Sequence, residues 1–125
     1  MQKIYFKRPE KSTKRENGVY DGIESLIDEW GEQSEDILDS DFMLVDVGRA
    51  DPKDLYMAGI AEGSGVEGLY FYKHGRENPV PSDSSITVME YNTKKELVYG
   101  IRDGLRENTL EVLKGGIRAS LSAYR

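Results

Sequence analysis

A βαβ unit within residues 41–72 is the feature that most limits how this chain can fold. Residues 42–47 are apolar apart from one aspartate, which is typical of a strand buried on both faces. The segment 52–61 predicts a helix with Asp51 as its N-cap, and a second apolar run follows at 66–72. Two strands joined through a helix are parallel, and their crossover is right-handed.

The carboxyl ends of such strands predict where a ligand binds. Ligands of open α/β sheets lie in the crevice beyond those ends, which here places the site in the loop from Gly48 to Asp54. The whole pattern predicts an α/β fold, Rossmann-like or flavodoxin-like, with three layers and a small, mostly parallel four-stranded sheet. The expected strands are 3–6, 42–47, 67–72 and 86–91, with helices on both faces.

Three further segments have helical patterns. Apolar residues spaced three or four apart predict a helix over 19–30, and residues 34–40 predict a short turn with Ile37 and Leu38 inward. The sequence T-x-x-E from Thr93 to Glu96 is a capping box that opens another helix.

Residues 107–125 form a predicted C-terminal helical extension with an apolar stripe, interrupted by two glycines. A domain this small does not need that stripe for its own core, so a homodimer through this helix is one interpretation. Packing of the helix back onto its own chain is the other. The stripe consists of Leu110, Leu113, Ile117, Leu121 and Tyr124.

Composition narrows the class of protein. A chain of 125 residues has the size of a single domain. With no cysteine there is neither a disulfide framework nor a thiolate metal site, and the single His74 argues against histidine-based zinc. No metal or cofactor is expected. No apolar run approaches the ~20 residues of a membrane span, and the first residues lack a signal-peptide core, so we expect a cytoplasmic protein without a membrane partner.

Charge is distributed unevenly along the chain. The formal net charge is −6, yet residues 1–16 carry six Lys or Arg against two Glu, which leaves −10 on the remainder. An acidic body argues against general nucleic-acid binding, which needs a basic face. The basic segment either holds one small anion or is a solvated loop.

Several short motifs resemble the nucleoside 2-deoxyribosyltransferase-like family. That family opens with a strand K-I-Y-L-A-G-P, where residues 3–9 read K-I-Y-F-K-R-P. Its S/A-D-x-x-V-A-x-L strand matches residues 40–47, S-D-F-M-L-V-D-V, and its helix Y-E-L-G-x-A matches residues 56–61, Y-M-A-G-I-A. The segment ITVMEYNTKKEL also stands where the family has its last strand and helix. The resemblance covers residues 3–106 and implies that the family's second strand is missing here.

The resemblance implies a specific chemistry and a specific loss. In the family, the Glu of Y-E-L-G attacks the sugar carbon of an N-glycosidic bond, while another acid assists departure of the base. Met57 occupies that position, and a thioether cannot perform this attack. The family's Asp upstream is retained as Asp51. Glu62 faces away on the helix, whereas Asp54 lies about 60° from Met57 and is the credible substitute.

A second departure concerns cations. Lys7 and Arg8 replace the family's Ala-Gly, and Arg49 lies in the neighbouring loop. Long cations crowd a neutral nucleoside but can clamp a phosphate, Arg through paired N–H donors. The plainer alternative is that all three balance an acidic surface.

Three functions remain open from the sequence. The first is a nucleoside- or nucleotide-binding protein that is catalytically impaired by Met57. The second is an active N-glycosidase or deoxyribosyltransferase that uses Asp54 or Asp51, and the third is a protein–protein interaction module with a vestigial site. The catalytic candidates are Asp51 and Asp54. The candidate ligand-binding residues are Tyr5, Lys7, Arg8, Gly48, Arg49, Tyr56 and Met57.

Overall fold

The computed structural model describes residues 2–81 and 86–123, with side-chain surroundings up to residue 110. The described residues form a single sheet together with three α-helices and one short 3₁₀ helix. In chain order the elements are β1 (Gln2–Phe6), α1 (Lys14–Trp30), β2 (Gly31–Ser34), η1 (Ile37–Asp39), β3 (Phe42–Asp46), α2 (Pro52–Gly63), β4 (Glu67–Lys73), β5 (Val88–Tyr91) and α3 (Lys94–Ala123).

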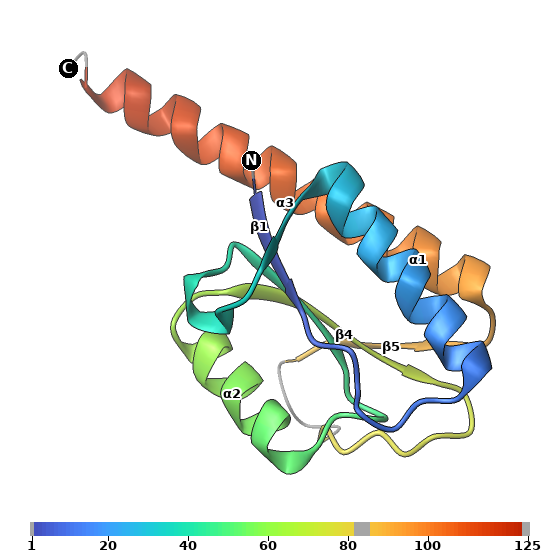
Figure 1. The fold of residues 1–125 in the computed structure, drawn as a ribbon. Helices are drawn as coiled ribbons and strands as arrows, with labels where there is room; N and C mark the ends of the chain where they lie inside the picture. Colours follow the sequence, from blue (N-terminus) through green and yellow to red (C-terminus); the bar gives the residue numbers. More distant parts are fainter. Residues whose placement is uncertain (1, 82–85, 124–125) are drawn as a thin grey trace.

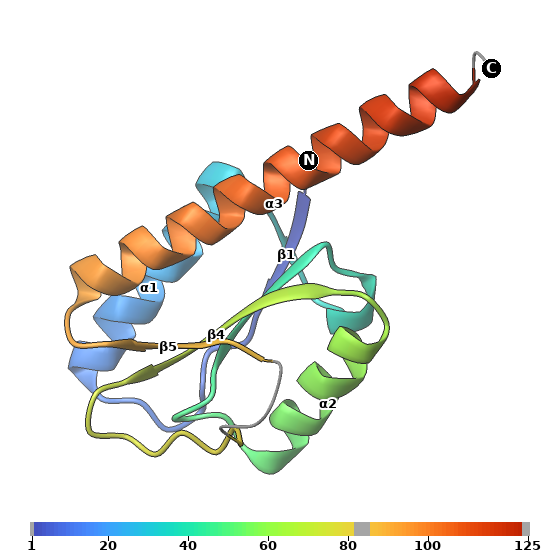
Figure 2. The same ribbon diagram turned by 180° about the vertical axis from the view of Figure 1, so that it is seen from behind.

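The sheet has the order β2-β1-β3-β4-β5, and every neighbouring pair is parallel. Helices α1 and α3 cover one face, while α2 covers the other (Figures 1 and 2). This order is that of flavodoxin-like folds. The predicted three-layer α/β class and the parallel pairing of β3 with β4 are confirmed.

The predicted strand count is wrong, because β2 was missed. Gly31–Ser34 pairs with β1 and fills the place where the sequence indicated a missing strand. The segment G-E-Q-S is short and polar, as edge strands are, and carries none of the β-branched residues that mark a buried strand. Gly31 is required there, since a Cβ would lie 2.3 Å from the backbone oxygen of Gln2.

Two apolar clusters hold the layers together. Neighbouring residues of β3 point to opposite faces, so Leu44 packs with α1 and α3 whereas Met43 and Val45 pack with α2. All five residues of β3 are buried, as predicted for a central parallel strand. Ile37 is buried but Leu38 is 48% exposed, so the inward placement predicted for Leu38 is wrong.

The helix starts follow local capping chemistry. Helix α1 begins at Lys14, earlier than its apolar stripe predicts, because Thr13 and Glu16 form a complete capping box. Asp51 caps α2 as predicted and accepts the N–H of Asp54 at 2.9 Å. At α3, Thr93 accepts the N–H of Glu96 as expected, while the Glu96 carboxylate accepts the N–H of Asn92.

Helix α3 continues through Gly115 and Gly116 and extends well past the body of the domain (Figures 1 and 2). Leu110, the first residue of the predicted stripe, is 49% exposed. The side chains of residues 113, 117, 121 and 124 lie outside the described part. Within that part, no helix combines the length and apolarity that crossing a membrane requires.

Candidate functional site

The strand order creates a crevice between β1 and β3. From β1 the chain crosses to β2 on one side, whereas β3, β4 and β5 follow on the other side. At such a switch point the loops beyond the two carboxyl ends diverge, which leaves room for a ligand. Lys7 follows β1 at this edge, and the loop 47–51 leads from β3 into α2.

A cavity of about 30 Å³ lies at this switch point. Residues from the end of β1, the end of β3 and the first turn of α2 meet around it. Three of the nine candidate residues from the sequence line it together. The lining consists of Tyr5, Lys7, Pro9, Ile37, Leu44, Val45, Asp46, Ala50 and Asp54.

An ion pair lies at the mouth of this cavity. The ammonium group of Lys7 is 3.0 Å from a carboxylate oxygen of Asp54, and both side chains are partly exposed. The hydrogen bond from Lys7 to Asp54 raises the pKa of the lysine, with a smaller contribution from Asp51. Burial, followed by the charge of Asp54, raises the pKa of Tyr5. The structure therefore brings Lys7, Asp51, Asp54 and Tyr5 close together, as the sequence predicted for one site.

Asp46 is a site residue that the sequence interpretation missed. It is only 5% exposed, accepts a hydrogen bond of 2.7 Å from the Tyr20 hydroxyl, and accepts the Gly48 N–H at 3.1 Å. Burial raises the pKa of Asp46, and these hydrogen bonds oppose that rise. A signal was present in the sequence, because Asp46 is the one acid within the otherwise apolar run 42–47.

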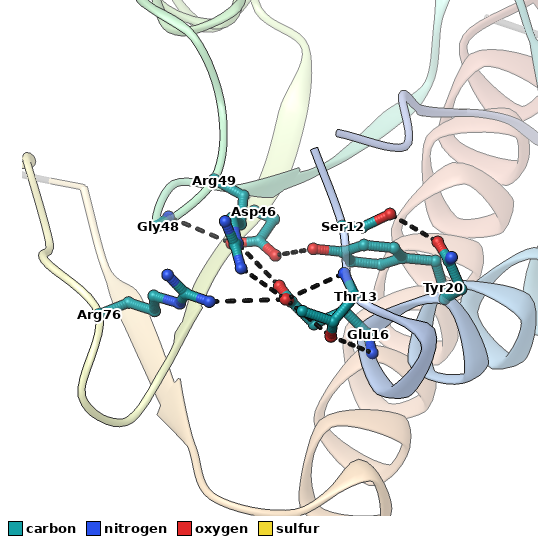
Figure 3. Close-up of polar contacts among 9 residues, drawn as sticks. Ser12, Thr13, Glu16, Tyr20, Asp46, Gly48, Arg49 and Arg76 are labelled. Atoms are coloured by element: carbon teal, nitrogen blue, oxygen red, sulfur yellow. Dashed lines mark hydrogen bonds and ion pairs between the residues drawn. The ribbon is translucent and has the colours of Figure 1, made fainter. Parts of the chain in front are cut away.

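A buried ionic cluster continues from Asp46 towards α1 (Figure 3). Glu16 accepts two hydrogen bonds from the Arg49 guanidinium, at 2.8 and 2.6 Å, and lies 3.5 Å from Arg76. Burial favours a raised pKa for Glu16, but the bonds from Arg49 and Thr13 outweigh it, so the pKa lies below its ordinary value. Glu16 thus ties the start of α1 to the loops after β3 and β4.

All three predicted phosphate-binding cations are paired with acids, Lys7 with Asp54 as described above. Arg49 is neutralised by Glu16, and Arg8 contacts Asp21 at 2.6 Å and Glu24 at 2.9 Å. The Arg8 guanidinium also lies 6.0 Å from the centre of the Tyr20 ring. Of these three cations, Lys7 is the one that lines the cavity.

The remaining predicted residues have other surroundings. Tyr56 is 70% exposed on α2, and Met57 packs against the apolar cluster beneath that helix. Gly48 donates its N–H to the Asp46 carboxylate and does not present it to a ligand. Asp51 acts as the cap of α2. Among the described residues, no group of three or more His, Asp or Glu side chains is arranged to hold a metal ion.

No family model matches the chain, and no curated protein matches its sequence. The fold and cavity define a flavodoxin-like α/β domain with a crevice at its switch point that both polar and apolar side chains line. The resemblance to the nucleoside 2-deoxyribosyltransferases rests on the short sequence motifs alone.

Proposed function

We propose that this protein binds a nucleoside or nucleotide at the crevice between β1 and β3, without transferring the sugar. The observation that supports this is the position of the cavity, which lies at the switch point of a flavodoxin-like sheet. Its lining offers a tyrosine, a lysine and two aspartates, which are suited to a sugar hydroxyl, a base edge and a phosphate.

Ligand entry requires exchange of the Lys7–Asp54 ion pair. A cavity of about 30 Å³ has room for a water molecule but not for a nucleoside. Exposed ion pairs are weak because water solvates both partners well. Separation of the pair releases the carboxylate for sugar hydroxyls and the ammonium for a phosphate. The ligand thus replaces an internal contact with two contacts of its own.

The position of Met57 supports binding without catalysis. Its thioether packs in the apolar cluster under α2, where the family has its nucleophilic carboxylate. The alternative enzyme would use Asp54 or Asp51 instead. Asp54 is paired with Lys7 and Asp51 holds the α2 cap, so each carboxylate already has a structural partner.

The direct test measures binding of nucleosides and their monophosphates by calorimetry. Lys7→Gln should weaken monophosphate binding about tenfold, while nucleoside binding stays equal or improves because Asp54 is released. Asp54→Asn should weaken both ligand classes. Lys3→Gln is a matched control, since the Lys3 side chain is as exposed as that of Lys7 and forms an ion pair with Asp39 at the opposite end of β1. Absence of binding by every ligand, or equal effects of the two lysine variants, would refute the proposal.

Base release from nucleosides separates the binding protein from the enzyme. The native protein should release almost no base, and Met57→Glu should introduce or strongly raise cleavage by restoring a carboxylate nucleophile. If the native protein cleaves briskly and Asp54→Ala abolishes this without loss of binding, the enzyme interpretation is correct.

We also propose that α3 mediates a homodimer. The helix extends beyond the body of the domain, and its sequence there carries the apolar stripe (Figure 1). Sedimentation at high micromolar concentration tests this, with a monomer of 14.1 kDa as the contrary result. A dimer without any nucleotide binding would favour the interaction-module alternative.

A further inference from the structure

A second cleft, separate from the nucleotide crevice, opens between the starts of α1 and α3. The two helices run side by side with their amino ends together (Figures 1 and 2). The cleft has a volume of about 300 Å³ and shares no lining residue with the cavity between β1 and β3. Its lining consists of Arg15, Gly18, Val19, Lys73, Tyr91, Asn92, Thr93 and Lys94.

Three cations of this cleft have no partner among the described residues. Within the described part of the chain, Arg15, Lys73 and Lys94 form no ion pair and no side-chain hydrogen bond, and no acid is among the lining residues. In a protein of net charge −6 this arrangement is unusual. Lys73 and Tyr91 are register partners at the carboxyl ends of β4 and β5, so their side chains share the face that α1 and α3 cover.

Tyr91 adds a hydroxyl group to which no described residue is hydrogen-bonded. The residue is only 3% exposed, yet its hydroxyl forms no hydrogen bond with any described residue. Its ring is held by an edge contact with Phe71, with the ring centres 6.1 Å apart. Burial, with the nearby charges of Asp46 and Glu16, raises the pKa of Tyr91 to about 12, so the hydroxyl keeps its proton at neutral pH. Tyr91 is one of the residues that line the cleft.

Gly18 leaves space in the wall of the cleft, and no closely packed neighbour explains why a glycine stands there. It lies inside α1, where glycine is a poor helix former, and a Cβ there would meet nothing within 4 Å. The close packing of helices therefore does not explain the missing side chain. What the glycine does provide is space beside Arg15 and Val19 on the cleft wall.

From three cations without a partner among the described residues, a lining tyrosine whose hydroxyl has none there either, and the open volume, we propose that this cleft binds the diphosphate or triphosphate group of a small molecule. Three cations match several phosphoryl charges, and the tyrosine donates to one phosphoryl oxygen. The acidic body disfavours a nucleic-acid strand, whose phosphates would extend beyond the cleft onto carboxylates. This site goes beyond the proposed nucleotide crevice and does not depend on it.

Pyrophosphate alone is the probe, with calorimetry and NMR shifts as the readouts. The native protein should bind it with a dissociation constant below about 1 mM, weakening with added salt. Arg15→Gln, Lys73→Gln and Lys94→Gln should each lower affinity about tenfold. Lys14→Gln and Lys95→Gln are matched controls, because each removes the same charge one residue from a cleft cation without lining the cleft, and should change affinity less than about twofold.

Gly18→Leu tests the volume independently of charge, since it fills the space but keeps every cation. It should abolish pyrophosphate binding while circular dichroism shows an intact fold. No binding to the native protein, or equal losses in cleft and control variants, would overturn the proposal. Tighter binding of a short single-stranded oligonucleotide than of pyrophosphate would overturn the small-molecule class. Loss of monophosphate binding with pyrophosphate binding retained would mark failure of the nucleotide crevice alone, and the reverse would mark failure of this cleft alone.

Discussion

The two openings at the carboxyl edge of the sheet differ in how their charges are satisfied. Beside β1 and β3, Lys7, Arg8 and Arg49 each have an acidic partner. Beside β4 and β5, Lys73 and Lys94 have none among the described residues. The first region is therefore held closed by its own ion pairs, whereas the second is open and has an excess of positive charge.

The contrast distinguishes cations that are paired within the protein from cations whose charge is left for a ligand. A cation paired with its own carboxylate has little charge left for a ligand, and removing a buried partner is costly because the other charge is then left without compensation. A cation with no partner contributes little to stability, and its whole charge is available to an anionic ligand. Substitutions in the first region should therefore change the free energy of unfolding, and those in the second should change anion affinity.

Glu16→Ala should have the largest effect on stability. It removes the acid shared by Arg49 and Arg76 and also half of the capping box of α1. We expect a loss of about 3 kcal/mol, because two arginines lose a largely buried partner. Urea denaturation measures this. Glu24→Ala, at an exposed ion pair with Arg8, is the control and should cost less than about 1 kcal/mol. Equal losses in the two variants would show that the buried ion pairs of Glu16 stabilise the fold no more than the exposed pair of Glu24 does.

The Glu16 ion pair should also have a defined pH dependence. The folded pKa of Glu16 lies below its unfolded value of about 4.3, so its stabilisation is full above that value and is lost as pH falls through the folded pKa. Glu16→Gln keeps the cap but not the charge. Its deficit of about 2 kcal/mol at neutral pH should shrink on acidification. Asp46, whose pKa is raised, acts in the opposite sense in both proteins and largely cancels. A constant deficit between neutral pH and about pH 3 would contradict this account.

Tyr20→Phe should be the next largest change. The Tyr20 hydroxyl donates to Asp46 at 2.7 Å in a buried setting, and its removal leaves the Gly48 N–H as the donor to that carboxylate among the described residues. We expect a loss of about 1.5 kcal/mol in urea denaturation. A change near zero would mean that water replaces the hydroxyl, which would contradict the closed nature of this region.

Much of the fold was predictable because its signals are local. The apolar runs of β3 and β4 and the proline-started helix between them define a βαβ unit. Strand β2 was not predictable in this way, because an edge strand buries little and needs no apolar pattern. Its existence depends on pairing with β1, and the close approach of Gly31 to Gln2 is visible only in three dimensions.

The candidate sites were predictable only in part, because ion pairs link distant residues. The loop after β3 was correctly expected to reach the crevice, and Lys7 and Asp54 meet there although 47 positions separate them. The pairing of Arg49 with Glu16 spans 33 positions, and no pattern in the sequence announces it. The basic cleft needs residues from four elements, α1, β4, β5 and α3, and the register of β4 with β5, so Lys73 was not singled out.

Gly18→Ala should change the free energy of unfolding by a smaller amount, and it should stabilise the protein rather than destabilise it. A Cβ at this position meets nothing, so the usual gain in helix propensity should stabilise the protein by about 0.5–1 kcal/mol. Gly22→Ala is the control one turn later. Its Cβ would lie 2.9 Å from the Cε atom of Lys94, so the gain there should be smaller because the lysine must move. Thermal denaturation compares the two variants. A loss of stability at position 18 would show that the glycine has a packing role.

Tyr91→Phe should have the smallest effect on stability and completes a matched pair with Tyr20→Phe. Both tyrosines are almost fully buried, but no described residue accepts or donates a hydrogen bond at the Tyr91 hydroxyl. Its removal should change the free energy of unfolding by less than about 0.5 kcal/mol, because no protein hydrogen bond is lost. Pyrophosphate affinity should fall about threefold, since one neutral donor is removed. Tyr20→Phe should show the reverse, with a clear loss of stability and unchanged pyrophosphate affinity. If both variants lose stability equally, the hydroxyl of Tyr91 is part of the folded core, and the distinction between the closed and the open region fails.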